Sequence, residues 1–117
     1  MTSFRDLELW KLSVDFVVDV YKITRKFPNS EIYGLSSQMQ RAAVSIPSNI
    51  AEGSGRKNPK EFIQFLHIAK GSLAEIETQL EIALRLDYIK ETSEFTDKAK
   101  RIRMMIIKLC DSLTYLK

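Results

Sequence analysis

Two stretches of apolar residues that repeat at alternating steps of four and three constrain the fold of this chain more than any other feature. The first stretch consists of Phe62, Leu66, Ala69, Leu73, Ile76, Leu80 and Ala83. The second consists of Phe95, Ala99, Ile102, Ile106, Leu109, Leu113 and Leu116. This spacing places an apolar stripe on one face of an α-helix, so each stretch predicts a long helix that packs against other helices.

Local signals set the expected bounds of these two helices at about 58–88 and 93–116. Asn58 is a good N-cap, Pro59 suits the first helical position, and Glu61 stands where a capping box requires an acid. Gly71 falls in mid-helix and costs roughly 1 kcal/mol relative to alanine. A glycine at such a position more often permits close helix approach than marks a functional site.

A further helix is expected over about 6–26, and it carries two apolar rows. Phe27 and Pro28 end it, because the residue before a proline disfavours the helical region. The first row consists of Leu7, Trp10, Val14, Val17, Tyr21 and Thr24. The second consists of Leu9, Leu12, Phe16, Val20, Ile23 and Phe27.

The remaining helix is expected over about 30–52, with its start left open between Ser30 and Ser36 by Gly34. Pro47 removes a backbone donor inside it and predicts a kink. Gly53 and Gly55 are natural C-terminal stops.

Together these signals predict an all-α fold, an antiparallel up-down-up-down four-helix bundle in which residues 1–117 form a single domain. One bundle core needs about one wide apolar stripe per helix. The helix over 6–26 has two, and the helix over 58–88 has a partial second row. The partial row consists of Phe65, Ile68, Ile82, Leu86 and Ile89. This surplus of apolar surface favours a homo-oligomer.

Composition argues against several classes of function. The single Cys110 excludes an intrachain disulfide and suits a reducing, cytoplasmic environment. We expect no membrane association, because no segment reaches the roughly 18–20 apolar residues of a membrane span. His67 is the only histidine and Gln64 precedes it by three residues, so the Glu-x-x-His pairs of a di-iron bundle are missing. We therefore expect no metal, no cofactor, no catalytic residue and no enzymatic activity.

A polar row is the least ordinary feature of the helix over 30–52. It consists of Gln38, Arg41, Ser45, Asn49, Glu52 and Arg56. Ser72, Glu75 and Gln79 share a face of the next helix, so the two rows could face each other. We expect a structural polar network in which Arg41, Asn49, Glu52 and Glu75 are partly buried and mutually hydrogen-bonded. The alternative is a groove or oligomer surface that contacts a ligand, and an active site is the least expected reading.

Basic residues are concentrated toward the C-terminus, although the formal net charge is only +3. Between Glu75 and Glu94 the balance reverses, with six acids and two bases. The candidate nucleic-acid contacts are Arg56, Lys57, Lys98, Lys100, Arg101 and Arg103. These basic clusters either keep one face of a helix hydrated or, when an oligomer repeats them once per subunit, bind phosphates. No aromatic platform lies among them, so any binding of RNA or DNA would be electrostatic and weakly sequence-specific.

Several blocks of this sequence resemble one known family. Its opening is matched by Trp10, Tyr21, Phe27-Pro28, Glu31 and Tyr33-Gly34-Leu35. Its central block is matched by Gln38, Arg41-Ala42-Ala43, Ser45-Ile46, Ser48 to Gly53 and Gly55-Arg56. Its third helix is matched by Phe62, Phe65-Leu66, Ala69, Gly71-Ser72, Glu75 and Glu77-Thr78-Gln79. The chain resembles proteins encoded by intervening sequences in bacterial 23S ribosomal RNA genes.

The resemblance implies an antiparallel four-helix bundle that forms one subunit of a pentameric ring. The family is also similar to the accessory protein of diversity-generating retroelements, a basic pentameric barrel thought to bind nucleic acid and a reverse transcriptase. It supplies no catalytic residues, and Gln40 stands where a second basic residue is expected beside Arg41. The expected function is a homopentamer that binds RNA or DNA. The alternative is a scaffold whose partner is another protein.

Overall fold

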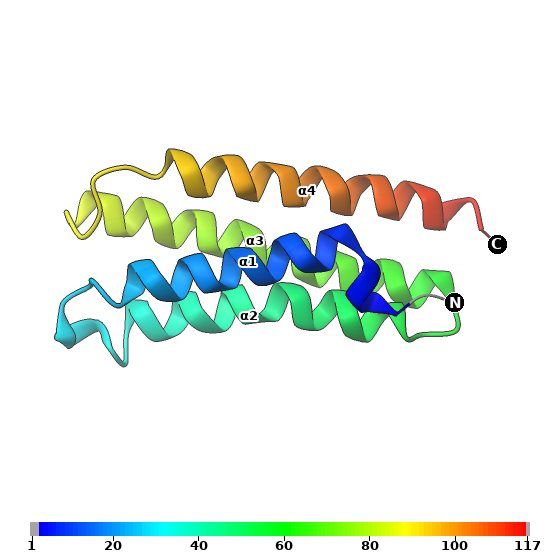
Figure 1. Ribbon diagram of the computed structural model, residues 1–117, viewed down its shortest axis with the longest axis horizontal. Helices are drawn as coiled ribbons and strands as arrows, with labels where there is room; N and C mark the ends of the chain where they lie inside the picture. Colours follow the sequence, from blue (N-terminus) through cyan, green and yellow to red (C-terminus); the bar gives the residue numbers. More distant parts are fainter. Residues whose placement is uncertain (1–2, 117) are drawn as a thin grey trace.

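The computed structural model describes residues 3–116 and shows four α-helices packed along a common axis (Figure 1). They are α1 (Glu8–Thr24), α2 (Leu35–Ser54), α3 (Pro59–Arg85) and α4 (Ser93–Thr114). Short 3-10 helices at Phe4–Asp6 (η1) and Asn29–Glu31 (η2) precede α1 and α2. No strand occurs among the described residues, so the predicted all-α fold is confirmed.

The four helices form a bundle in which consecutive helices run in opposite directions, as Figure 1 shows. Each helix packs against the next, and α1 also packs against α4. Within the described part of the chain, the diagonal pairs α1–α3 and α2–α4 have no Cα atoms within 8 Å of each other. The molecule measures 48 × 23 × 20 Å.

The predicted apolar stripes form the core. On α3, the stripe from Leu66 to Ala83 is buried throughout, and on α4, Ala99, Ile102, Ile106 and Leu113 are buried. On α1, the second predicted row supplies the buried Leu9, Phe16 and Val20. The first row lies at the edge of the core, where Trp10, Val14 and Tyr21 are only partly buried. One row of α1 therefore fills the core, and the other borders the core, with Thr24 buried and its remaining members partly buried.

The ends of the helices differ from the predicted bounds by a few residues. At the start of α2, the Glu31 carboxylate accepts a 3.0 Å hydrogen bond from the backbone N–H of Leu35, which places the helix start after Gly34. α2 continues through Pro47 without a break and ends at Ser54. α3 ends before Asp87, whose φ of 63° lies in the left-handed region.

Two glycines have roles that the sequence did not reveal. Gly53 lies inside α2, and a Cβ atom there would stand 2.7 Å from Phe65 Cβ and 2.9 Å from Phe62 Cδ1 of α3. Gly53 therefore permits the close approach of α2 and α3 instead of ending the helix. Gly71, in contrast, has no close neighbour within the chain. A Cβ atom at Gly71 would meet nothing within 4 Å, so the expected close helix approach at this residue does not occur within the chain.

Candidate self-association and nucleic-acid surfaces

Part of the predicted polar row joins α2 to α3. Ser45 Oγ and Ser72 Oγ share a 2.9 Å hydrogen bond across the two helices. Asn49 donates from Nδ2 to the Ser45 carbonyl at 2.7 Å and to Ser45 Oγ at 2.9 Å. All three residues are partly buried. This small cluster links α2 to α3 through three residues that the sequence assigned to the polar network.

The charged members of the row lie outside this cluster. Arg41, Glu52 and Glu75 are exposed, as is Gln38 at the start of the row. Glu52 accepts a 2.9 Å hydrogen bond from Arg56 of the following turn. Among the described residues, the predicted four-residue network is therefore not formed within a single chain. The physical reason is that an ion keeps its hydration on the outer face of a helix, whereas burying it would carry a large desolvation penalty.

Gln79, which the sequence placed on one face of the helix with Ser72 and Glu75, is buried. Its side chain is only 5% exposed, and its Nε2 lies 3.4 Å from Glu75 Oε2. Within the described part of the chain, its Oε1 is buried and has no hydrogen-bond partner. A buried acceptor left unpaired costs about 1–3 kcal/mol, so this position reduces the stability of the isolated chain.

Half of the predicted nucleic-acid contacts are engaged in ion pairs. Lys98 pairs with Asp19 of α1, and Arg103 pairs with Glu77 of α3. The side chains in these two pairs are only about a third exposed, so the pairs hold α4 against both of its neighbours. The third engaged base is Arg56, which pairs with Glu52 and lies 4.8 Å from the centre of the Phe65 ring.

The other three predicted contacts are available at the surface. Lys57, Lys100 and Arg101 are exposed, and none has an ion-pair partner among the residues that the structure describes. Lys100 and Arg101 are adjacent on α4 and line a shallow hollow with Asp97, Met104 and Met105. Lys57 lies instead beside the N-terminus of α3, in a hollow closed by the last turn of α4. Of these three bases, Lys100 and Arg101 form an adjacent pair, whereas Lys57 lies apart from them.

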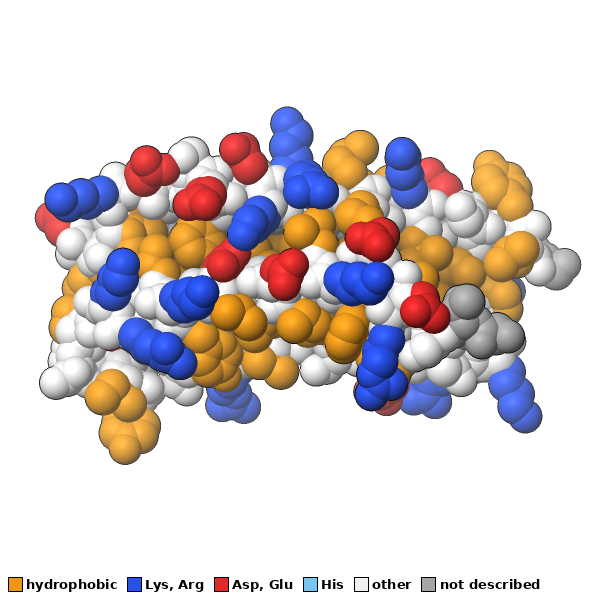
Figure 2. All heavy atoms as spheres, in the orientation of Figure 1, with side chains coloured by type: hydrophobic (Ala, Val, Ile, Leu, Met, Phe, Trp, Pro, Cys, Tyr) orange, Lys and Arg blue, Asp and Glu red, His pale blue; other side chains and the backbone are white. Residues whose placement is uncertain are grey.

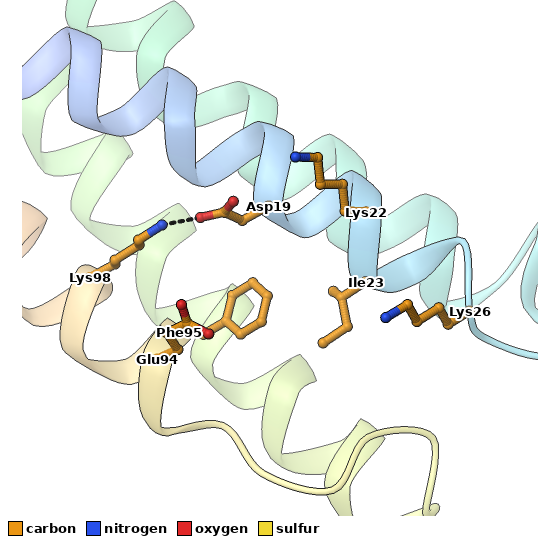
Figure 3. Close-up of a pocket in the computed structure, with 7 residues that line it drawn as sticks. All are labelled: Asp19, Lys22, Ile23, Lys26, Glu94, Phe95 and Lys98. Atoms are coloured by element: carbon orange, nitrogen blue, oxygen red, sulfur yellow. Dashed lines mark hydrogen bonds and ion pairs between the residues drawn. The ribbon is translucent and has the colours of Figure 1, made fainter.

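A small cleft separates α1 from the beginning of α4 (Figure 3). It encloses about 180 Å³ and is lined by Asp19, Lys22, Ile23, Lys26, Glu94, Phe95 and Lys98. In Figure 3 the ion pair between Asp19 and Lys98 lies along one side, and Phe95 and Ile23 present apolar groups toward the space between the helices. Bases and acids are mixed along the cleft, so it presents no concentrated charge of one sign to a ligand.

Apolar side chains gather over the middle of α1 and α2, as Figure 2 shows. The exposed members are Val18, with 45% of its surface exposed, and Val44, with 40%. Val14, Val17 and Tyr21 lie half-buried beside them on α1. A second apolar surface lies on α3 and its last turn, where Ile68, Ile82 and Leu86 are 52%, 44% and 49% exposed. Ile68, Ile82 and Leu86 belong to the partial second row predicted for the helix over 58–88, whereas Val18 and Val44 belong to neither predicted apolar row.

The residues with potential for metal binding or nucleophilic chemistry are dispersed. Burial raises the pKa of the Cys110 thiol, which keeps it protonated and weakly nucleophilic. His67 is exposed on α3. Among residues 3–116, no group of three or more His, Cys, Asp or Glu side chains is placed to hold a metal ion. In the same part of the chain, no helix combines the length and apolarity needed to cross a membrane.

Comparison with known proteins gives a family match. No curated protein matches the chain. A family model described as 23S rRNA-intervening sequence protein matches residues 5–108, from the first 3-10 helix to the last third of α4. This match covers α1, α2 and α3, most of α4, and the polar cluster between α2 and α3. The chain therefore belongs to the 23S rRNA-intervening sequence protein family.

Proposed function

We propose that the protein is a non-enzymatic homo-oligomer, a pentamer, that binds RNA or DNA through phosphate contacts on α4. The proposal rests on a difference among the bases of α4, two of which form ion pairs and two of which do not. Lys98 and Arg103 are paired with acids of α1 and α3, whereas Lys100 and Arg101 lie between them, exposed and unpaired within the described residues. A phosphate can approach this pair without displacing an existing partner.

The ion pairs narrow the set of contacts that the sequence suggested. For Lys98 or Arg103 to bind a phosphate, each would have to leave a carboxylate that it already contacts. That exchange replaces one ion pair with another, so its net gain in free energy is small. The expected contacts are therefore Lys100 and Arg101, with Lys57 next.

Assembly would increase the affinity of this small basic patch for nucleic acid. A single chain carries a formal charge of +3, and two unpaired lysine and arginine side chains bind phosphates weakly. A ring repeats the pair once per subunit on a common surface, and each additional phosphate contact steepens the dependence of affinity on salt by about 0.9 in logarithmic slope. The apolar surfaces on α1–α2 and α3 supply a driving force for that assembly.

The test is a measurement of RNA and DNA affinity as a function of salt. We expect wild-type protein to bind a structured RNA and an unrelated duplex DNA with similar affinity, falling steeply between about 50 mM and about 200 mM salt. The variant Lys100→Gln/Arg101→Gln should bind both more weakly and with a flatter salt slope. Lys26→Gln/Lys90→Gln removes the same charge from two exposed positions elsewhere and should change little.

Two results would refute the nucleic-acid proposal. One is the absence of binding at about 50 mM salt, where electrostatic contacts are strong. The other is an equal loss of affinity in the α4 variant and in the control variant, since this would reflect net charge alone.

A protein partner for the same surface is the second candidate. It is favoured by the exposed Met104, with half of its surface accessible, between the basic pair and Ile107. An apolar side chain among bases suits an acidic, partly apolar protein surface better than a phosphate backbone. If the assembled wild-type protein binds no nucleic acid, this scaffold role becomes the better account.

A further inference from the structure

The two apolar surfaces border the same helix, α2. Thr24 of α1 accepts a 2.9 Å hydrogen bond from Gln40 of α2, so its side of α1 faces α2. Val17 and Tyr21 lie seven and three residues before Thr24, which places them on that same side. Together with Val44 of α2 they form what we call the first face, on the α1–α2 side of the bundle.

The second apolar surface lies on the α2–α3 side of the bundle. Ser72 marks the side of α3 that faces α2, because it shares a 2.9 Å hydrogen bond with Ser45. Ile68 lies four residues before Ser72 and Leu86 two heptads after it, so both lie on that side. We call Ile68, Ile82 and Leu86 the second face. The first and second faces are therefore on adjacent sides of the bundle and meet at α2.

Two adjacent faces suit a closed ring. In a ring of five copies, the directions from one copy to its two neighbours differ by about 108°. Adjacent sides of a four-helix bundle point about 90° apart, whereas opposite sides point about 180° apart and would build a straight row. The first face of one copy therefore meets the second face of the next, and the helix between the two faces, α2, points toward the ring axis.

The directions and levels of the helices agree with this contact. Because consecutive helices are antiparallel, α1 and α3 run in the same direction (Figure 1). Rotation about the ring axis keeps that direction and adds no shift along the axis, so α1 meets α3 of the next copy parallel and level. Lys98 holds Asp19, and Arg103, five residues later on α4, holds Glu77. Ile82, five residues after Glu77 on α3, is thus level with Asp19, in the middle of the first face.

The exposed residues of α2 form a single stripe between the two faces. They recur at steps of three and four and are Gln38, Arg41, Val44, Ser48 and Glu52. In the ring this stripe faces the axis. Within residues 3–116, α4 lies diagonally across from α2, with no Cα atoms of the two helices within 8 Å. Lys100 and Arg101 of α4 are therefore on the outside of the ring.

Arg41 is the charge of this stripe that has no counterpart. Glu52, the other charged member, pairs with Arg56 at 2.9 Å. Arg41 is exposed and has no ion-pair partner in the described part of the chain. A ring brings one such guanidinium group from every copy toward a common axis, where the like charges repel each other. An oxyanion on the axis would offset that repulsion, and the planar guanidinium fork matches the oxygens of a phosphate group.

We propose that α2 of every copy faces the ring axis and that the Arg41 side chains together bind a free phosphate-type anion there. The site is incomplete in a single chain, and it is separate from the outer bases of α4. This inference rests on the proposed pentamer and adds an internal anion site to it. Because only the assembled ring presents the complete site, anion binding stabilises the assembly.

Spin labels test the placement of α2. Ser48→Cys and Met104→Cys, each combined with Cys110→Ser, place one nitroxide label per chain on the α2 stripe or on the outer side of α4, at exposed positions. Dipolar electron paramagnetic resonance should give a shorter distance between labels for the Ser48 variant, since α2 is nearer the axis. Light scattering checks that both labelled proteins keep the wild-type mass. An equal or shorter distance for the Met104 variant would overturn the placement.

Inorganic pyrophosphate tests the anion site. At equal ionic strength, replacing chloride with pyrophosphate should lower the subunit concentration for half-assembly of the wild type by at least about three-fold. Arg41→Gln should abolish this response, and in chloride it should assemble at least as well as wild type because the repulsion is removed. Two controls should keep the response: Arg25→Gln, at an exposed position of α1, and Lys100→Gln/Arg101→Gln. Sedimentation velocity over a concentration series measures this, and thermal dissociation gives the same comparison where assembly is complete.

The outcomes separate this inference from the proposal on which it rests. A monomeric wild-type protein would refute the pentamer and the inference together. An assembled wild type that does not respond to pyrophosphate, or whose response persists in Arg41→Gln, would refute the anion site alone. A response through Arg41 to a single-stranded oligonucleotide but not to pyrophosphate would assign Arg41 to nucleic-acid phosphates and overturn the free-anion site.

Discussion

Tyr88 donates a 2.8 Å hydrogen bond from its hydroxyl to Glu31 Oε2, and this bond joins the α3–α4 connection to the α1–α2 connection. The other carboxylate oxygen of Glu31 accepts the backbone N–H of Leu35 at 3.0 Å, which satisfies a free donor in the first turn of α2. The bond from Leu35, followed by that from Tyr88, lowers the pKa of Glu31. The bond to Glu31 in turn raises the pKa of the Tyr88 hydroxyl.

Acid should weaken the bundle through Glu31. Because its folded-state pKa lies below the ordinary value of 4.5, the ionised carboxylate contributes stability above that pH, and the contribution is lost as the pH falls through the folded-state pKa. We expect Glu31→Gln to melt at a lower temperature than wild type at neutral pH. This gap in melting temperature between wild type and variant should close as the pH falls. Tyr88→Phe should show a smaller gap, because Leu35 keeps its acceptor. Thermal melts across the pH range measure this, and a gap independent of pH would contradict it.

Alanine substitution should have opposite effects at two glycines of this bundle. Gly53→Ala introduces a Cβ atom 2.7 Å from Phe65 Cβ, so α2 and α3 must separate, and we expect a loss of about 1–3 kcal/mol in the free energy of unfolding. Gly71→Ala meets open space and should increase the helix stability of the isolated chain by roughly 0.5–1 kcal/mol. Urea unfolding at one fixed protein concentration measures both.

The same Gly71→Ala variant should assemble less well than wild type if another subunit approaches that face. Equal stability changes at Gly53 and Gly71 would show that neither position depends on its neighbours.

Replacing Gln79 by an apolar residue should stabilise the isolated chain. Gln79→Leu removes a buried oxygen that has no partner among the described residues, at the expense of one long hydrogen bond to Glu75. Removal of an unsatisfied buried acceptor is expected to increase the free energy of unfolding by about 1 kcal/mol. Chemical denaturation is the appropriate measurement. A loss of stability instead would mean that the Gln79 amide has a partner in the folded protein.

The fold could be predicted largely from the sequence because the apolar periodicity of α3 and α4 is uninterrupted. The stripe from Leu66 to Ala83 is buried as expected, and the start of α3 follows the Asn58-Pro59 signal. Helix ends were less predictable, since the end of α3 depends on one residue, Asp87, in the left-handed region. The role of Gly53 was not predictable either, because it depends on which side chains of another helix lie beside it.

The candidate site was predicted only in part, because the sequence does not show which side chains of different helices contact each other. The sequence identified the bases of α4 but could not show that Lys98 and Arg103 contact acids of α1 and α3. It also identified the polar row of α2, of which Ser45 and Asn49 form contacts whereas Arg41 faces outward. Residue type and spacing place a side chain on a face. They do not show which residue of another helix lies opposite.

Neighbouring arginines on α4 should differ in their effect on nucleic-acid affinity. Arg101 is exposed and unpaired within the described residues, whereas Arg103 pairs with Glu77. Arg101→Gln should therefore weaken RNA binding more than Arg103→Gln does. Arg103→Gln should instead lower the free energy of unfolding by up to about 1 kcal/mol, the usual range for a partly exposed ion pair. Greater loss of affinity at Arg103 would reverse the assignment of the two residues.

The molar mass of the purified wild-type protein in solution tests the central claim most directly. Light scattering coupled to size-exclusion chromatography, at micromolar subunit concentration, should give a single species with five times the chain mass of 13.5 kDa. The mass should fall when Val18 is replaced by glutamate while the helical circular dichroism signal is kept. A uniform species of 13.5 kDa for the wild type would contradict the account, because the apolar surfaces of α1–α2 and α3 would then remain exposed in a stable monomer.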